Sequence, residues 1–283
     1  MIQILPVITN KGGVGKTTTC VNLAAAFALA GRRTLIVDLD GQASASLTLG
    51  LKRSDLAVSS AQVIFGDVSV SEAAVQTKVP LLDLVPGSMD LASADLRLGR
   101  MADRVTRLRA ALAPARKDYD LILLDCPPSA SLLTINAVMA GDALIIPVVP
   151  SYLSIEGLIS FGEMLRHIHS GVGRMAPVLG IAITRADMDK REVRMAAEVI
   201  TQRYGARVFS TIIHPDPKLE TAPLQGKTVF EVDASTPGAL EYAALADEVI
   251  ERITQLAEAV TRAKAKRAAE ELTTPAPPAG QPA

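Results

Sequence analysis

A glycine-rich stretch near the start of the chain limits the possible folds more than any other feature. Residues 10–18 read NKGGVGKTT; they follow the apolar run Ile2–Thr9 and precede the alanine-rich segment Cys20–Ala30. This order predicts a strand, a tight loop and a helix, with successive backbone N–H groups converging at the positive end of the helix dipole. Such a loop binds the phosphate groups of a nucleotide.

Each residue of the loop has an expected task. Lys16 would reach the β- and γ-phosphates of a nucleoside triphosphate, and the Thr17 hydroxyl would bind Mg²⁺. A glycine-rich turn that binds no ligand is the alternative, which the flanking strand and helix disfavour. The expected nucleotide-binding residues are Gly12, Gly13, Val14, Gly15, Lys16, Thr17 and Thr18.

Composition bounds the class of protein. The chain has 283 residues, 49% of them hydrophobic, with a net charge of −1. It can therefore bury a substantial core, and any binding of nucleic acid or anionic lipid has to come from a local patch. Cys20 and Cys126 lie far apart and outside any metal-ligand pattern, which favours free thiols in a reducing compartment. No signal peptide or membrane-spanning stretch is recognised, so we expect a cytoplasmic protein.

Branched apolar runs that alternate with helical segments predict an α/β fold, with a mostly parallel sheet covered by helices on both faces. Further strands are expected at residues 34–40, 81–85, 120–125, 143–149, 178–184 and 207–213. Apolar periodicity predicts helices at 103–113, 155–169 and 191–204, and a long amphipathic helix from Leu240 to about Leu272. We expect one three-layer domain over residues 1–272 and a disordered, Pro- and Ala-rich tail over 273–283.

Carboxylates follow two of the expected strands. In an open parallel sheet, ligands bind beyond the carboxyl ends of the strands. Asp125 ends the apolar run 121–124 and could hold Mg²⁺ directly or through water. Asp38 and Asp40 end the second strand, and residues two apart on a strand face the same side. Helix capping is the alternative for all three carboxylates.

The loop, with its second lysine at Lys11, resembles the deviant Walker A motif of the ParA/MinD ATPases. The resemblance implies their P-loop NTPase fold and extends to about residue 255. It includes 38–43 and 125–129, which look like the family's two switch segments, and also 86–92, 155–158 and 219–227.

The resemblance also implies roles for individual side chains. Lys11 would cross a nucleotide-sandwiched dimer to the partner's ATP, Asp40 would orient the attacking water, and Asp38 would contact the hydration shell of Mg²⁺. The implied catalytic residues are thus Lys11, Lys16 and Asp40, and the implied metal site is Thr17, Asp38 and Asp125. Thr184, His214 and Pro215 would lie near the purine, although the family normally has proline in place of His214.

A partition ATPase is the function that the resemblance implies first. It would hydrolyse ATP with Mg²⁺, bind DNA non-specifically on the nucleoid as an ATP-dependent homodimer, and segregate plasmids or chromosomes with a ParB-like partner that stimulates hydrolysis. The implied DNA contacts are Lys190, Arg191, Arg194, Lys218 and Lys227, for which ordinary solvated positions are the alternative.

Two other classes share this loop. A MinD-like division-site regulator needs a C-terminal amphipathic segment with bulky apolar residues, whereas residues 262–267 carry only alanines between their charges. We therefore expect no membrane partner.

An iron–sulfur relative needs two cysteines at a dimer axis, which Cys20 inside the first helix does not suit. An ATP-dependent ligase would need a substrate pocket, which is not recognisable, and a positioning ATPase for another cargo stays open.

Overall fold

A seven-stranded sheet lies at the centre of the computed structural model, which describes residues 2–273 except 57 and 174 and, for residues 55 and 264–273, the backbone alone. The strand order is β3-β4-β2-β5-β1-β6-β7. Only the short edge strand β3 is antiparallel to its neighbour; the other pairings are parallel, as expected. The strands are β1 (Ile4–Val7), β2 (Thr34–Asp38), β3 (Val75–Gln76), β4 (Leu82–Val85), β5 (Leu121–Asp125), β6 (Leu144–Val148) and β7 (Val178–Ile183).

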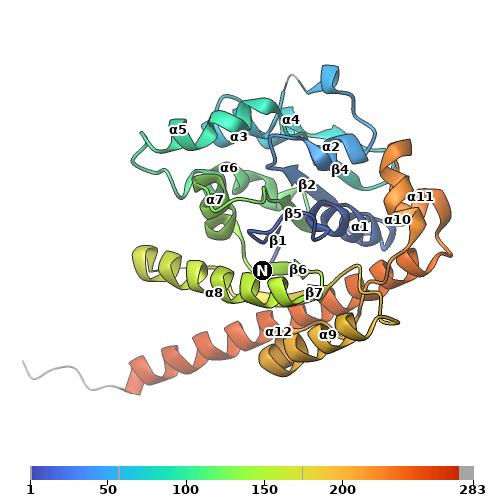
Figure 1. Ribbon diagram of the computed structural model, residues 1–283. Helices are drawn as coiled ribbons and strands as arrows, with labels where there is room; N and C mark the ends of the chain where they lie inside the picture. Colours follow the sequence, from blue (N-terminus) through green and yellow to red (C-terminus); the bar gives the residue numbers. More distant parts are fainter. Residues whose placement is uncertain (1, 57, 174, 274–283) are drawn as a thin grey trace, which may run out of the picture.

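Helices fill the intervals between the strands (Figure 1). The α-helices are α1 (Lys16–Leu29), α2 (Ser44–Thr48), α3 (Ser60–Phe65), α4 (Val70–Ala73), α5 (Ala94–Leu98), α6 (Arg107–Leu112), α7 (Leu132–Ala140), α8 (Tyr152–Val172), α9 (Arg191–Tyr204), α10 (Pro217–Thr221), α11 (Val229–Asp233) and α12 (Pro237–Thr273). Short 3₁₀ helices are η1 (Arg53–Asp55), η2 (Met89–Ser93), η3 (Pro114–Lys117), η4 (Gly205–Arg207) and η5 (Ala222–Gln225).

Strand side chains alternate between two apolar cores, as the period of a strand requires. On β5, Ile122 and Leu124 join the core under α3, α6, α7 and α8, whereas Leu121 and Leu123 join the core under α1 and α12. Both cores are almost fully excluded from solvent. The expected three layers, helices on both faces of one sheet, are therefore confirmed.

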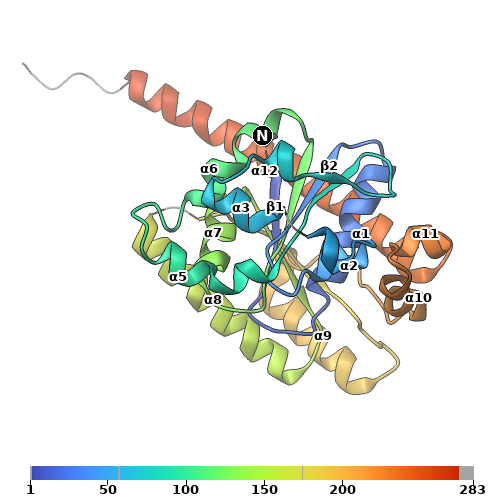
Figure 2. The same cartoon turned by 90° about the horizontal axis from the view of Figure 1, so that it is seen from above.

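The last helix is the longest. Tyr242, Leu245 and Val249 of α12 pack in the α1 core, and the C-terminal half of the helix extends beyond the sheet (Figure 2). No helix among the described residues is both long enough and apolar enough to span a bilayer. The helix reaches Thr273; the rest of the expected tail lies outside the described residues.

The strand predicted at 207–213 is wrong. Val208 forms an isolated bridge to Ile181 of β7, and the N–H groups of Phe209 and Ile213 donate to the carbonyls of Ile181 and Ile183, both at 2.9 Å. The N–H groups of Ser210 and Thr211 donate to the Glu248 carboxylate of α12, at 2.8 and 3.0 Å, and so cannot form strand pairs. A side-chain acceptor from a distant helix thus interrupts the pairing with β7 between Phe209 and Ile213, which no local pattern could indicate.

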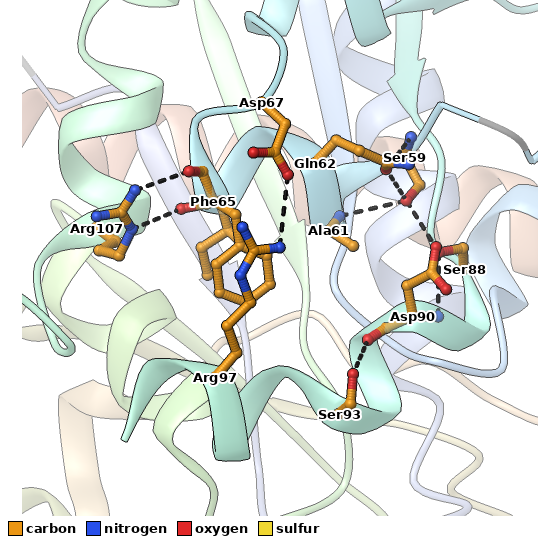
Figure 3. A network of polar contacts seen from close by, with 11 residues as sticks. Ser59, Ala61, Gln62, Phe65, Asp67, Ser88, Asp90, Ser93, Arg97 and Arg107 are labelled. Carbon is orange, nitrogen blue, oxygen red and sulfur yellow. Dashed lines mark hydrogen bonds and ion pairs between the residues drawn. The ribbon is translucent and has the colours of Figure 1, made fainter. Parts of the chain in front are cut away.

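Polar contacts brace the outer layer around α3 and α5 (Figure 3). Arg97 lies 3.8 Å from the centre of the Phe65 ring and forms an ion pair of 3.5 Å with Asp67. Arg107 donates to the carbonyls of Ile64 and Phe65, at 3.0 and 2.8 Å, and so satisfies the C-terminal end of α3. These contacts hold α3 against both α5 and α6.

Candidate functional site

The glycine-rich loop connects β1 to α1, in the predicted order of strand, loop and helix, and β1 lies between β5 and β6 in the sheet. Gly13 and Gly15 have φ angles of 74° and 79°, a left-handed conformation that lets the loop close around an anion. Lys16 begins α1, and its ammonium donates to the Lys11 carbonyl at 2.7 Å. Burial lowers the pKa of Lys16, although the nearby Asp125 raises it. A buried cation thus lies where phosphate charge would accumulate.

A cavity of about 680 Å³ opens beside this loop. Its walls come from the loop, from Asp40, from α2 and from the chain that follows β7. This volume fits a nucleotide-sized ligand. The predicted residues that line the cavity are Gly12, Gly13, Gly15, Lys16, Thr17, Thr18, Asp40, Thr184, His214 and Pro215.

Asp125 lies beneath the cavity and is completely buried. Its Oδ2 accepts a hydrogen bond from the Thr17 hydroxyl at 2.8 Å, but its Oδ1 has no hydrogen-bond partner among the described residues. An orphaned, buried carboxylate oxygen beside a hydroxyl is a set of hard oxygen donors that suits Mg²⁺. The described residues contain no cluster of three or more His, Cys, Asp or Glu for a metal, so phosphate oxygens and water would complete the coordination.

Asp38 contacts protein groups with both of its oxygens. Oδ1 accepts the N–H of Asp40 at 3.1 Å, and Oδ2 accepts the N–H and hydroxyl of Ser46 at 3.0 and 2.7 Å. Because Ser46 lies in the first turn of α2, Asp38 satisfies one N–H at the start of this helix, close to the capping alternative, although the N-cap residue is Ala43. Burial raises the pKa of Asp38 to about 6, partly offset by the bonds from Ser46. Its contact with the hydration shell of Mg²⁺ stays a prediction.

Asp40 differs from Asp38 because it lies beyond the end of β2 and lines the cavity. Its Oδ1 accepts the N–H of Gln42 at 2.9 Å, a local contact that orients the side chain. The two aspartates therefore do not act as a matched pair: Asp38 holds α2, and Asp40 borders the cavity.

Lys11 does not line the cavity. Its ammonium donates to the Ser154 hydroxyl of α8 at 3.0 Å, and Ser154 in turn contacts Ser151 at 2.8 Å. In this conformation the ammonium is directed to α8 and not to the nucleotide site of its own chain.

The residues expected near the purine line the cavity, but their side chains have other partners. The Thr184 hydroxyl donates to the Val14 carbonyl at 2.9 Å and thereby ties β7 to the glycine-rich loop. His214 contacts Glu241 of α12 with its N–H at 2.8 Å and with its Nδ1 at 2.7 Å. These contacts shape the wall, and the roles in base binding stay predictions.

Sequence reasoning missed Arg185 and Glu220 at the same end of the cavity. Both line it, and they form an ion pair of 3.5 Å across the loop and α10. Arg185 has a φ angle of 50°, which is unusual for a residue other than glycine and is associated with functional sites. No local signal marks such a conformation in the sequence.

The predicted DNA contacts lie on α9, on α10 and in the loops beside them. Arg191 and Lys218 are exposed. Lys190 forms an ion pair of 3.1 Å with Asp187, and Arg194 donates to the carbonyls of Met188 and Asp189 at 2.6 and 3.0 Å. Lys190 and Arg194 thus brace their own loop. Lys227 is half-buried and follows η5.

Comparisons with known proteins agree with this geometry. A family model described as an AAA domain matches residues 2–175. The chromosome partitioning protein ParA of Caulobacter vibrioides is 34% identical over 253 residues, which are 89% of this chain and 95% of that protein.

Solved structures show the same likeness. Cobyrinic acid a,c-diamide synthase from Mycobacterium smegmatis with bound ADP and magnesium is 31% identical, with a TM-score of 0.78, over 90% of this chain and 96% of that one. The septum site-determining protein MinD from Pyrococcus horikoshii, complexed with Mg-ADP, is 26% identical with a TM-score of 0.73, over 88% and 96%. The chain belongs to the ParA/MinD family of P-loop ATPases.

Proposed function

We propose that this chain is a Mg²⁺-dependent ATP hydrolase whose ATP-bound form is a homodimer that binds DNA non-specifically and partitions plasmids or chromosomes. A ParB-like partner would stimulate hydrolysis and release the dimer from DNA. One observation carries the proposal: Lys11 belongs to the phosphate loop, yet its ammonium is directed away from the cavity, to Ser154. A lysine so placed suits a phosphate of a second subunit better than one of its own.

The phosphate end of the cavity supports ATP and Mg²⁺ as ligands. Lys16 supplies positive charge, and Thr17 with the orphaned Asp125 oxygen supplies hard donors for the metal. Two of the similar structures hold ADP with magnesium and Mg-ADP. The bound Mg²⁺ would neutralise negative charge that develops on the phosphates, and the Lys16 ammonium would stabilise the same charge from the loop.

Asp40 is the residue best placed to orient water. It borders the cavity, whereas Asp38 and Asp125 lie beneath it and are completely buried. We therefore assign water positioning to Asp40 and the bracing of α2 to Asp38. The bond from the N–H of Asp40 to Asp38 Oδ1 couples the two residues.

ATP turnover tests the proposal. It is measured with and without non-specific duplex DNA, over a range of salt concentrations, for the wild type and for Asp40→Ala. We expect the variant to keep ATP-dependent dimerisation and DNA binding while hydrolysis is largely lost. The matched control is Asp247→Ala, which removes an exposed carboxylate of α12 and should leave turnover unchanged. A monomer in every nucleotide state would contradict the proposal.

An ATP-dependent amide ligase is a second candidate, because a cobyrinic acid a,c-diamide synthase is among the similar structures. The same assay separates the two functions. A ligase would hydrolyse ATP only when its acid and amine substrates are present, independently of DNA, whereas the partition ATPase needs neither substrate.

A further inference from the structure

Two glycines bring distant parts of the backbone into direct contact. Gly50 follows α2 with a φ angle of 87°, and Gly226 follows η5 with a φ angle of 62°. A Cβ atom added to Gly226 would lie 2.6 Å from the Gly50 Cα, and one added to Gly50 would lie 3.0 Å from the Gly226 carbonyl oxygen. A side chain on Gly226 would therefore force the two segments apart.

The Gly50 side of this contact belongs to the nucleotide site. Ser44 and Thr48 of α2 line the cavity, and between them Ser46 donates two hydrogen bonds to Asp38. Ser46 also accepts the N–H of Gly87 at 3.0 Å. The position of α2 thus depends on Asp38, which also accepts the N–H of the cavity-lining Asp40.

The Gly226 side belongs to residues 217–227, which we name the α10–η5 segment. Leu219, Glu220 and Pro223 of this segment line the same cavity. The segment also carries Lys218, which is exposed, and Lys227, both predicted to contact DNA. A single short stretch is therefore both a wall of the nucleotide cavity and part of the predicted DNA surface.

A polar anchor holds the start of the segment. Asp216 is buried; its Oδ1 accepts the N–H of Lys218 at 2.7 Å, and its Oδ2 accepts the N–H of Gly238 in α12 at 2.8 Å. The far end rests on Gly50. A shift of α2 is therefore expected to rotate the segment about its anchored start, because two backbones in van der Waals contact cannot interpenetrate.

We propose that the Gly50–Gly226 contact transmits the nucleotide state from α2 to the α10–η5 segment and so controls whether Lys218 and Lys227 can bind DNA. This inference rests on the DNA binding proposed above. It would explain why a segment with two lysines that are predicted to contact DNA lines the nucleotide cavity. Allosteric couplings of this kind typically change an affinity by about 5- to 150-fold.

The test measures the affinity for a fluorescently labelled, non-specific DNA duplex with a non-hydrolysable ATP analogue and with ADP. The variant Gly226→Ala is compared with Gly31→Ala. Gly31 also has a positive φ angle, of 83°, but no atom in the described part of the chain lies within 4 Å of an added Cβ, apart from its own neighbours in the chain. The control thus reproduces the backbone strain without separating the segments. We expect the ratio of the two DNA affinities to fall to about 1 in Gly226→Ala and to stay at the wild-type value in Gly31→Ala.

Several outcomes distinguish this inference from the proposed function. If wild-type DNA binding depends on nucleotide and Gly226→Ala keeps that dependence, the coupling is wrong while the function stands. If the wild type binds no DNA in any nucleotide state, both fail. Should Gly226→Ala not fold, Gly50→Ala replaces it, and hydrogen–deuterium exchange of the wild type provides a second readout. Equal protection of residues 217–227 with the ATP analogue and with ADP would also overturn the coupling.

Discussion

Asp38 and Asp125 are direct partners at the ends of the neighbouring parallel strands β2 and β5, and both side chains are completely buried. Burial raises the pKa of both carboxyl groups, to about 6 for Asp38, and the charge of Asp38 raises that of Asp125 further. Two adjacent buried carboxylates are costly without a cation. The two carboxylates at these strand ends therefore repel each other when both are ionised, and bound Mg²⁺ would reduce this repulsion.

This repulsion predicts that the stability of the ligand-free protein depends on pH. A raised folded-state pKa contributes stability below the ordinary value that is lost as the pH rises through the folded value. Asp142 and Glu248 have lowered pKa values because of hydrogen bonds that outweigh burial, so they are already ionised above about pH 5. We expect the melting temperature without ligand to fall between about pH 5 and pH 7.

Mg²⁺ should reverse that trend, because it binds the ionised carboxylates. The gain in melting temperature from Mg²⁺ with an ATP analogue should therefore increase over the same pH range. Asp125→Asn is the control; it removes the charge and should keep the gain small throughout. Thermal unfolding at each pH measures both effects, and a pH-independent melting temperature without ligand would contradict the account.

Lys11→Ala should abolish ATP-dependent dimerisation, because it removes the ammonium that would reach the partner's phosphate. Ser154→Ala removes only the hydroxyl that holds this ammonium on α8. If that bond has to break during dimerisation, its loss should lower the dimer dissociation constant on the order of 10-fold. Light scattering with ATP, in an Asp40→Ala background to prevent hydrolysis, measures both variants. A weaker dimer for Ser154→Ala would mean that Ser154 supports Lys11 in the dimer as well.

Lys218→Glu should weaken DNA binding by at least about 10-fold and reduce the slope of log affinity against log salt, because a phosphate contact is lost on each subunit. ATP binding should be unchanged. Lys78→Glu is the matched charge reversal, since Lys78 is exposed beside β3 at the far edge of the sheet. Equal losses in both variants would show that net charge, and not this site, governs the affinity.

Asn136→Ala should lower the free energy of unfolding by about 2–3 kcal/mol. Asn136 is completely buried in α7; its amide oxygen accepts the N–H of Leu108, and its amide nitrogen donates to the Arg104 carbonyl at 2.6 Å. The substitution would leave these backbone groups unpaired. Gln255→Ala, at an exposed position of α12, should change the stability by less than about 0.5 kcal/mol. Urea denaturation measures both variants.

Local signals in the sequence accounted for the elements that carry the phosphate site. The apolar run before the loop, the glycines and the helix after it lie within 30 residues, so the strand, the loop and α1 could be predicted from neighbours in the chain. The parallel sheet and Asp125 at the end of its strand followed from the same kind of pattern, and α9 was predicted with its observed bounds. Helices 103–113 and 155–169 were predicted with the right type but the wrong ends.

Contacts between distant residues determined the rest. Asp38 holds α2 through Ser46, Thr184 ties its hydroxyl to the Val14 carbonyl, and Lys11 is held by Ser154. Glu248 accepts the N–H groups of Ser210 and Thr211 and so interrupts the pairing of residues 207–213 with β7.

The sequence by itself thus determined which elements form and which residues can bind phosphate, because hydrophobic periodicity and loop chemistry act between near neighbours in the chain. Only the tertiary structure decided which polar groups pair and where Gly50 meets Gly226. The physical reason is that each buried donor or acceptor takes whichever partner the packed layers bring within reach, however far apart the two residues are along the chain.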